Sequence, residues 1–218
     1  MMTLTPMMVR SEFFIDVFGG RADTHSGSFS ATEDREAEIP GGELTSQGDL
    51  SGASSGMLGL RGGYWIGAEK LQWLGAAVDL SGFQADAQDT DADVAIYTAS
   101  LILMFRYPLM MSEEYAHGRF YPYAGIGALI AVVDISGAND TAQGMAGSDV
   151  GGMFCAGVKW MFTPKLGLFA EYRALSFSFD DRDVDVNYDP FGWSHTHVFE
   201  AEGDVTTHQL LGGVSYHF

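Results

Sequence analysis

The chain has 218 residues, a formal net charge of −18 and one cysteine, Cys155, so its composition disfavours nucleic acid as a partner and excludes an intramolecular disulfide. Hydrophobic residues make up 46% of the chain, yet no apolar run reaches the roughly 18 to 20 residues that a membrane-spanning helix needs. Glycine is abundant (28) and proline is scarce (6), which suits crowded, bending strands better than a linker-rich chain.

The first ten residues, MMTLTPMMVR, have no basic segment followed by an apolar core, so no secretory signal is visible in them. We expect residues 1–10 to be a disordered leader or remnant. We expect residues 11–218 to form a single domain.

Eight segments with alternating character follow along the chain. Alternation with period two is typical of β-strands that have two different faces. The eight predicted strands are residues 11–21, 55–66, 73–84, 94–107, 119–135, 150–162, 166–179 and 205–218. Long polar connections alternate with shorter ones between them. This rhythm predicts an all-β fold, an eight-stranded antiparallel up-and-down transmembrane β-barrel with long extracellular loops and short periplasmic turns.

The acidic residues are concentrated in the long connections. Of the 29 acidic residues, 22 lie in 22–54, 85–93, 134–149 and 180–204, together with only two basic residues, Arg35 and Arg182. The strands and short turns are therefore near neutral. The whole net charge of −18 is therefore predicted to lie at one rim of the barrel.

The charges inside the predicted strands share a face with small or polar residues. Arg61, for example, alternates with the apolar Leu58, Leu60 and Tyr64. A soluble, ligand-carrying barrel would show the inverse arrangement, so the pattern predicts lipid outside and a charged lumen. The predicted lumen charges are Asp16, Arg61, Asp79, Arg106, Lys159, Glu171 and Arg173. We favour a salt-bridge network that plugs the lumen, with a narrow ion path as the alternative.

Aromatic residues border the short turns. The predicted interface aromatics are Tyr64, Trp73, Tyr107, Trp160, Tyr216 and Phe218. Aromatic rings gather at membrane–water interfaces, so this distribution predicts a girdle at the periplasmic side.

Three stretches carry a family resemblance: PYAGIGALI, GVKWMFTPKLGLFAEYRALSF and the closing GGVSYHF, which ends on a phenylalanine inside a strand. They resemble the superfamily of small eight-stranded bacterial outer-membrane β-barrels, similar to the OmpA transmembrane domain. The resemblance covers residues 11–218. It implies a bacterial outer-membrane location, contact with outer-membrane lipid and lipopolysaccharide, and recognition of the C-terminal strand by the barrel assembly machinery.

The same resemblance leaves the function open. We expect a structural or surface-interaction role through the acidic extracellular loops, with an unidentified extracellular or envelope protein partner, no catalysis and no cofactor. The alternative is a narrow porin-like channel for small solutes or ions.

Two weak candidates for metal binding stand in the long connections. Asp89, Asp91 and Asp93 alternate in DTDAD, but the stretch lacks the glycine and glutamate of an EF-hand loop. His195 and His197 would point the same way on an extended segment, without a third ligand in place. We therefore predict no specific metal site.

A third hypothesis is an enzyme. If residue 179 lies opposite residue 205, then Ser176 lies opposite His208 on the lipid-facing side. A serine–histidine pair there is what an outer-membrane lipid acyl hydrolase would need. No orienting carboxylate has the right parity, so this hypothesis ranks last.

Overall fold

The computed structural model describes residues 11–36, 43–48, 53–68, 70–86, 92–137, 143–188 and 194–218. The strands are β1 (Glu12–Glu36), β2 (Glu43–Gly48), β3 (Ala53–Trp65), β4 (Leu74–Asp86), β5 (Ala92–Arg106), β6 (Phe120–Gly137), β7 (Gln143–Met161), β8 (Leu166–Tyr188) and β9 (Ser194–His217). Among these residues, no helix is long and apolar enough to cross a membrane. The segment predicted as a leader, residues 1–10, lies outside them.

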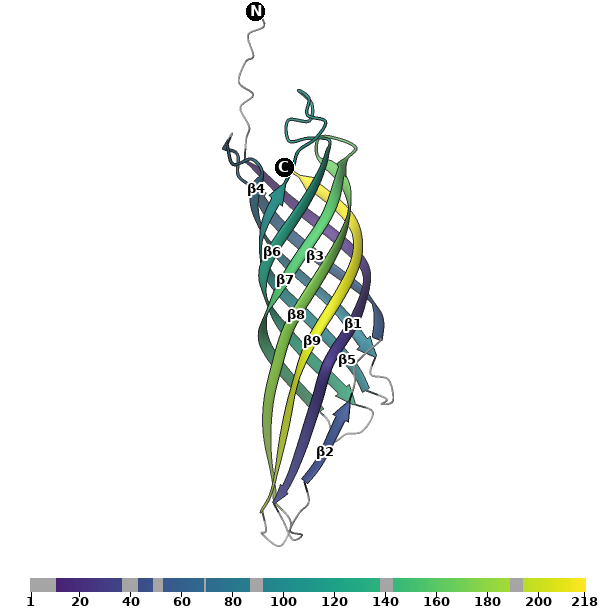
Figure 1. Ribbon diagram of the computed structural model, residues 1–218, viewed down its shortest axis with the longest axis vertical. Coiled ribbons are helices and arrows are strands. Elements are labelled where there is room, and N and C mark those ends of the chain that lie inside the picture. The colour runs from purple at the N-terminus through teal and green to yellow at the C-terminus, as the bar shows by residue number, and fades with distance from the viewer. Residues whose placement is uncertain are drawn as a thin grey trace, which may run out of the picture.

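Eight of the strands close into one antiparallel barrel. Each of β1 and β3 to β9 pairs with the next along the chain, and β1 also pairs with β9, with Phe14 opposite His217. Closure leaves no open sheet edge within the membrane, where unpaired amides would be costly. The prediction of an eight-stranded antiparallel barrel is confirmed (Figure 1).

The barrel wall has an apolar outer face and a mixed inner face. On β1, Phe14, Asp16 and Phe18 are buried in the lumen, whereas Ile15 and Val17 are 47% and 56% exposed on the outside. Successive side chains of a strand point to opposite faces, so this division follows directly from the alternation in the sequence.

The two ends of the barrel differ. The short turns 66–73 and 162–165, the connection 107–119 and the C-terminal Phe218 lie together, and we call this the short-turn end. In barrels of this architecture the short turns face the periplasm. In Figure 1 this end is uppermost, near the label of the C-terminus.

At the opposite, extended end, the prediction of long loops at 22–54 and 180–204 was wrong for much of their length. Strand β1 runs to Glu36, β8 runs to Tyr188 and β9 begins at Ser194, and together with β2 they reach past the rest of the barrel (Figure 1). The alternation continues there, with Val184 and Val186 between aspartates, but the density of acids hides it. Among the described residues, β7 and β8 pair no further outward than Gly151 opposite Phe177.

Candidate functional site

The lumen holds a balanced set of charges. All seven predicted lumen charges lie inside the barrel, each at most 4% exposed, and Glu12 on β1 joins them. The acids are Glu12, Asp16, Asp79 and Glu171, and the bases are Arg61, Arg106, Lys159 and Arg173. Four of each sign cancel. Balance is what burial demands, because an unpaired charge away from water is costly.

The centre of the network is a ring of two arginines and two carboxylates. Arg61 donates to both oxygens of Glu171, at 2.8 and 2.6 Å, and through Nε to Asp79 at 3.1 Å. Arg173 donates to both oxygens of Asp79, at 3.1 and 2.8 Å, and through Nε to Glu171. The Tyr123 hydroxyl also donates to Glu171. The planar guanidinium fork suits such two-point contacts.

This ring crosses the lumen from wall to wall. Asp79 is on β4 and Arg173 is on β8, and these strands are four positions apart in a closed ring of eight. They are therefore opposite each other. Their contact bridges the full width of the barrel.

A second chain of polar groups leads toward the short-turn end. Lys159 donates to Asp16 at 2.9 Å and to the Ser215 hydroxyl at 2.7 Å. Ser215 Oγ lies 2.8 Å from His217 Nε2, and His217 Nδ1 lies 2.5 Å from Glu12 Oε1. The chain joins the ring where Asp16 lies 3.8 Å from Arg61.

Arg106 completes this chain at the mouth of the lumen. It donates to Glu12 Oε2 at 2.6 Å and to the Gln72 carbonyl at 3.0 Å. Its guanidinium lies 4.4 Å from the ring centre of Trp65, a cation–π contact. Deeper in the lumen, the Arg173 guanidinium makes the same kind of contact, 4.3 Å from the ring centre of Phe18. Charges and rings together fill this part of the barrel.

His117, in the connection 107–119, lies beside this mouth. Its Nδ1 is 3.4 Å from Arg106 Nη2 and 3.7 Å from Glu12 Oε2. Burial lowers the pKa of His117 below its ordinary value of 6.5; the Glu12 carboxylate opposes the shift, and the nearby Arg106 and His217 reinforce it.

Sequence reasoning missed Glu12 and His217. Glu12 has the same parity as Asp16, and His217 has the same parity as Ser215, so the alternation contained both. Glu12 lies at the first position of its strand and His217 at the last of its own, where a predicted boundary is least certain. The charge balance of the lumen could have revealed Glu12. The seven predicted lumen charges sum to +1, so one more buried acid was needed to neutralise them.

Ser215, His217 and Glu12 have the order of a nucleophile, a base and an orienting carboxylate. Their surroundings favour a structural role. Ser215 is 0% exposed, and Lys159 already donates to the serine oxygen that would have to attack a substrate. The three residues link β9 to β1 and so fasten the seam of the barrel.

Beyond the ring, toward the extended end, the described side chains that fill the lumen are mostly apolar, among them Met57, Phe83, Ile96, Phe177 and Val205, with uncharged polar groups between them. Ser81 and Thr98 hydroxyls lie 2.8 Å apart, and Thr24 and Thr207 hydroxyls lie 3.3 Å apart. Gln209 is fully buried, and its amide has no hydrogen-bond partner among the described residues.

The six predicted interface aromatics all lie at the short-turn end. Tyr64 is half-buried, and Trp73, Tyr107, Trp160, Tyr216 and Phe218 are exposed on the outer face. Several pair with a neighbouring ring: Phe13 with Tyr64 at 4.8 Å, Trp73 with Phe105 at 5.9 Å, Phe120 with Trp160 at 5.9 Å, and Tyr216 with Phe218 at 5.0 Å. This position fits a girdle at a membrane interface.

The weak metal candidates fall mostly outside the described part of the chain. Asp89 and Asp91 are not described, and for Asp93, His195 and His197 only the backbone is, within β5 and β9. Among the side chains that the structure describes, no three histidine, cysteine or acidic residues form a group that could hold a metal ion.

The register assumed for the enzyme hypothesis was wrong. Val205 lies opposite Phe177, so Ser176 lies opposite Thr206 and His208 lies opposite Ala174. The observed register differs by two residues from the assumed one, and it is kept along the whole ladder out to Tyr188 opposite Ser194. His208 Nδ1 instead lies 2.6 Å from the Tyr172 hydroxyl.

Comparison with known proteins gives the same fold. Neisserial surface protein A is 16% identical and has a TM-score of 0.56, covering 94% of this chain and 96% of its own. The outer membrane protein OprG from Pseudomonas aeruginosa is 16% identical and has a TM-score of 0.55, covering 95% of each chain. No curated protein sequence matches the chain significantly.

The family described as "Outer membrane protein beta-barrel domain" matches residues 25–218, most of the chain. The closed barrel, its apolar outer face and its charged lumen fit that description. The chain therefore belongs to the outer membrane protein beta-barrel domain family and is an outer-membrane β-barrel protein.

Proposed function

We propose that this barrel is a non-conducting, non-catalytic structural protein that presents an acidic sheet at the cell surface. One observation carries the proposal: the Arg61, Asp79, Glu171 and Arg173 ring joins opposite walls of the lumen. An ion could pass only by separating buried pairs, and removing one partner of such a pair typically costs about 3 to 5 kcal/mol.

Conductance in planar bilayers tests the closed lumen. The purified barrel should show no steady conductance in concentrated potassium chloride at moderate voltage. Reproducible unitary steps would overturn the proposal and favour a narrow channel for small solutes or ions.

The extended strands support the surface role. Asp180 on β8 lies opposite Glu202 on β9, and like charges directly opposite each other destabilise a sheet. The single basic residue of this part of β8, Arg182, lies opposite Glu200, so it compensates only one of the acids. A cationic surface on an extracellular or envelope protein would relieve that repulsion, so the partner we propose is basic where it meets these strands.

A charge-reduced variant tests this partner chemistry. Asp180→Asn, Asp183→Asn, Glu200→Gln and Glu202→Gln together remove four acids of the extended strands and should weaken retention of proteoliposomes on polylysine beads at low salt. Wild-type retention should fall as salt rises, because exposed charges are screened. The control, Glu113→Gln with Glu114→Gln, removes two acids at the short-turn end and should leave retention nearly unchanged. Equal retention of the charge-reduced variant and the wild type would contradict the proposed role of the extended strands.

The membrane partners follow from the same architecture. We propose that outer-membrane lipid surrounds the apolar face and that lipopolysaccharide surrounds its outer half. We propose that the barrel assembly machinery recognises β9, which pairs with both β8 and β1 and closes the barrel.

A further inference from the structure

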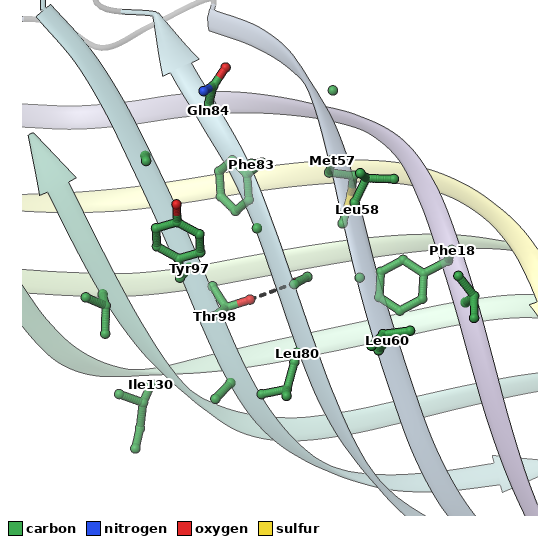
Figure 2. A pocket seen from close by; sticks show the side chains of 18 residues that line it. Phe18, Met57, Leu58, Leu60, Leu80, Phe83, Gln84, Tyr97, Thr98 and Ile130 are labelled. Carbon is green, nitrogen blue, oxygen red and sulfur yellow. Dashed lines mark hydrogen bonds between the residues drawn. The ribbon is translucent and has the colours of Figure 1, made fainter. Parts of the chain in front are cut away.

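The outer face of the barrel is not uniformly convex. Two adjoining apolar grooves, with volumes of about 1160 and 620 Å³, are lined by residues of β1 and of β3 to β6. The larger groove is surrounded by Leu58, Leu60, Leu80 and Tyr97 (Figure 2). The smaller groove lies between Ile15, Val78 and Leu101 on neighbouring strands.

Small outward residues create these grooves. Gly62 lines the smaller groove and Gly56 the larger one, and a Cβ atom added to either glycine would meet nothing within 4 Å. Leu60 and Gly62 are successive outward positions on β3, so the two grooves continue each other along the strand.

The smaller groove ends at the aromatic girdle. Phe13, Tyr64 and Phe218 line that end, and the Tyr64 hydroxyl donates to Ser11 Oγ at 2.7 Å. Lys70 is exposed in the turn that joins β3 to β4, two of the strands that line the groove. An apolar groove with hydroxyls at one end and a lysine in the adjoining turn suits one acyl chain below a phosphate head group.

We propose that this pair of grooves holds an acyl chain of one glycerophospholipid from the periplasmic leaflet. The chain enters between Tyr64 and Phe218, lies over Gly62 and ends near Leu60, and its phosphate meets Lys70. The leaflet follows from the position of the groove mouth at the short-turn end. One leaflet is about 15 Å deep, half of the roughly 30 Å hydrocarbon core, so a periplasmic chain stops short of Gly56.

Three phenylalanine substitutions separate this lipid from other occupants. Gly62→Phe fills the smaller groove and Gly56→Phe fills the far end of the larger one. Gly152→Phe is the matched control, because Gly152 faces outward on β7 away from both grooves, and its added Cβ also meets nothing within 4 Å. All three variants should fold, which heat-modifiability on gels verifies.

Native mass spectrometry then measures the fraction of delipidated protein that retains one added dipalmitoyl phosphatidylethanolamine in mild detergent. Gly62→Phe should lower this fraction about tenfold, since excluding two methylene groups from a groove suffices for that change. Gly56→Phe and Gly152→Phe should retain the lipid as the wild type does. Lys70→Gln should weaken retention by no more than about fivefold, as for an exposed ion pair.

Three results would overturn the proposal. Equal loss in all three phenylalanine variants, or in none, would mean ordinary boundary lipid. Retention of a lipopolysaccharide lipid anchor that only Gly56→Phe abolishes would place the occupant in the outer leaflet. A dimer that dissociates in Gly62→Phe would make the groove an interface between two copies of the chain.

Discussion

Glu12 and His217 are 205 residues apart in the chain, yet Glu12 Oε1 and His217 Nδ1 lie 2.5 Å from each other inside the barrel. The contact joins the two strands whose pairing closes the sheet. Glu12 also accepts a hydrogen bond from Arg106 at the mouth of the lumen. One carboxylate therefore stabilises both the β1–β9 pairing and the position of Arg106.

Replacing that carboxylate should weaken the barrel. Glu12→Gln leaves Arg106 buried without its counter-charge, so we expect the free energy of unfolding to fall by about 3 kcal/mol or more. The temperature at which the folded gel band disappears should fall accordingly. Glu114→Gln, which removes an exposed acid at the same end, should leave it unchanged. An unchanged temperature for Glu12→Gln would show that the seam does not depend on this contact.

Opening the central ring should create a path for ions. Arg61→Ala removes three hydrogen bonds and leaves the lumen with one excess negative charge. We expect cation-selective conductance in planar bilayers, because uncompensated carboxylates draw in water and cations. The double variant Arg61→Met with Glu171→Met keeps the balance of charge and volume and should stay closed. Conductance in the double variant but not in the single one would contradict the role of charge.

Strands β1 and β9 approach too closely for a side chain at Gly20. A Cβ atom there would lie 2.1 Å from the Leu210 carbonyl oxygen and 2.6 Å from the Leu211 Cα. Gly20→Ala should therefore lower the free energy of unfolding by about 1 to 3 kcal/mol, the usual cost of overpacking. Urea unfolding in detergent measures this. Gly62→Ala, which adds the same methyl group over open space, should match the wild type.

Mild acid should loosen the connection 107–119. Because the pKa of His117 is below 6.5 in the folded protein, the unfolded chain binds more protons as the pH falls below that value. Stability contributed by neutral His117 is therefore present above pH 6.5 and is lost as the pH falls through the lower folded-state value. The charges that face this ring are Glu12, Arg106 and His217.

Hydrogen exchange of the amides in this connection measures the effect. Exchange relative to the rest of the barrel should rise as the pH is lowered from 7 to 5. His117→Gln should remove that dependence. A dependence of equal size in the variant would assign it to another group.

Ser215 should be chemically inert. A fluorophosphonate reagent labels serines that a neighbouring base activates, and here the hydroxyl is buried and bonded to Lys159. We expect no labelling of the wild type and no lipid hydrolysis. Covalent labelling that Ser215→Ala abolishes would show a working nucleophile and would end the non-catalytic proposal.

The alternation of residues predicted the barrel and the interior of its network, because parity is fixed once a strand is recognised. Asp16, Arg61 and Lys159 each have the parity that the structure gives them. The sequence did not predict which of these charges pair with each other. A contact such as that of Asp79 with Arg173 depends on which strands lie opposite each other in the closed barrel.

The errors have a common physical origin at the ends of strands. Asp183 and Asp185 resemble a solvated loop, although the backbone ladder of β8 continues through them. The ladder therefore runs out to Tyr188 opposite Ser194, and in it Ser176 lies opposite Thr206 and not opposite His208. The packing of Trp65 against Arg106 was likewise not predicted, because it joins residues 41 positions apart on β3 and β5.

The pairing of β1 with β9 also makes assembly all-or-none. A chain that has placed seven strands in the bilayer still has two rows of unpaired amides, and lipid offers them no hydrogen bonds. The contacts that remove those rows span nearly the whole chain, so they carry the largest loop-closure entropy and form last. A partly built barrel therefore gains little stability of its own. Cellular quality control should encounter either the finished barrel or an open chain accessible to proteases.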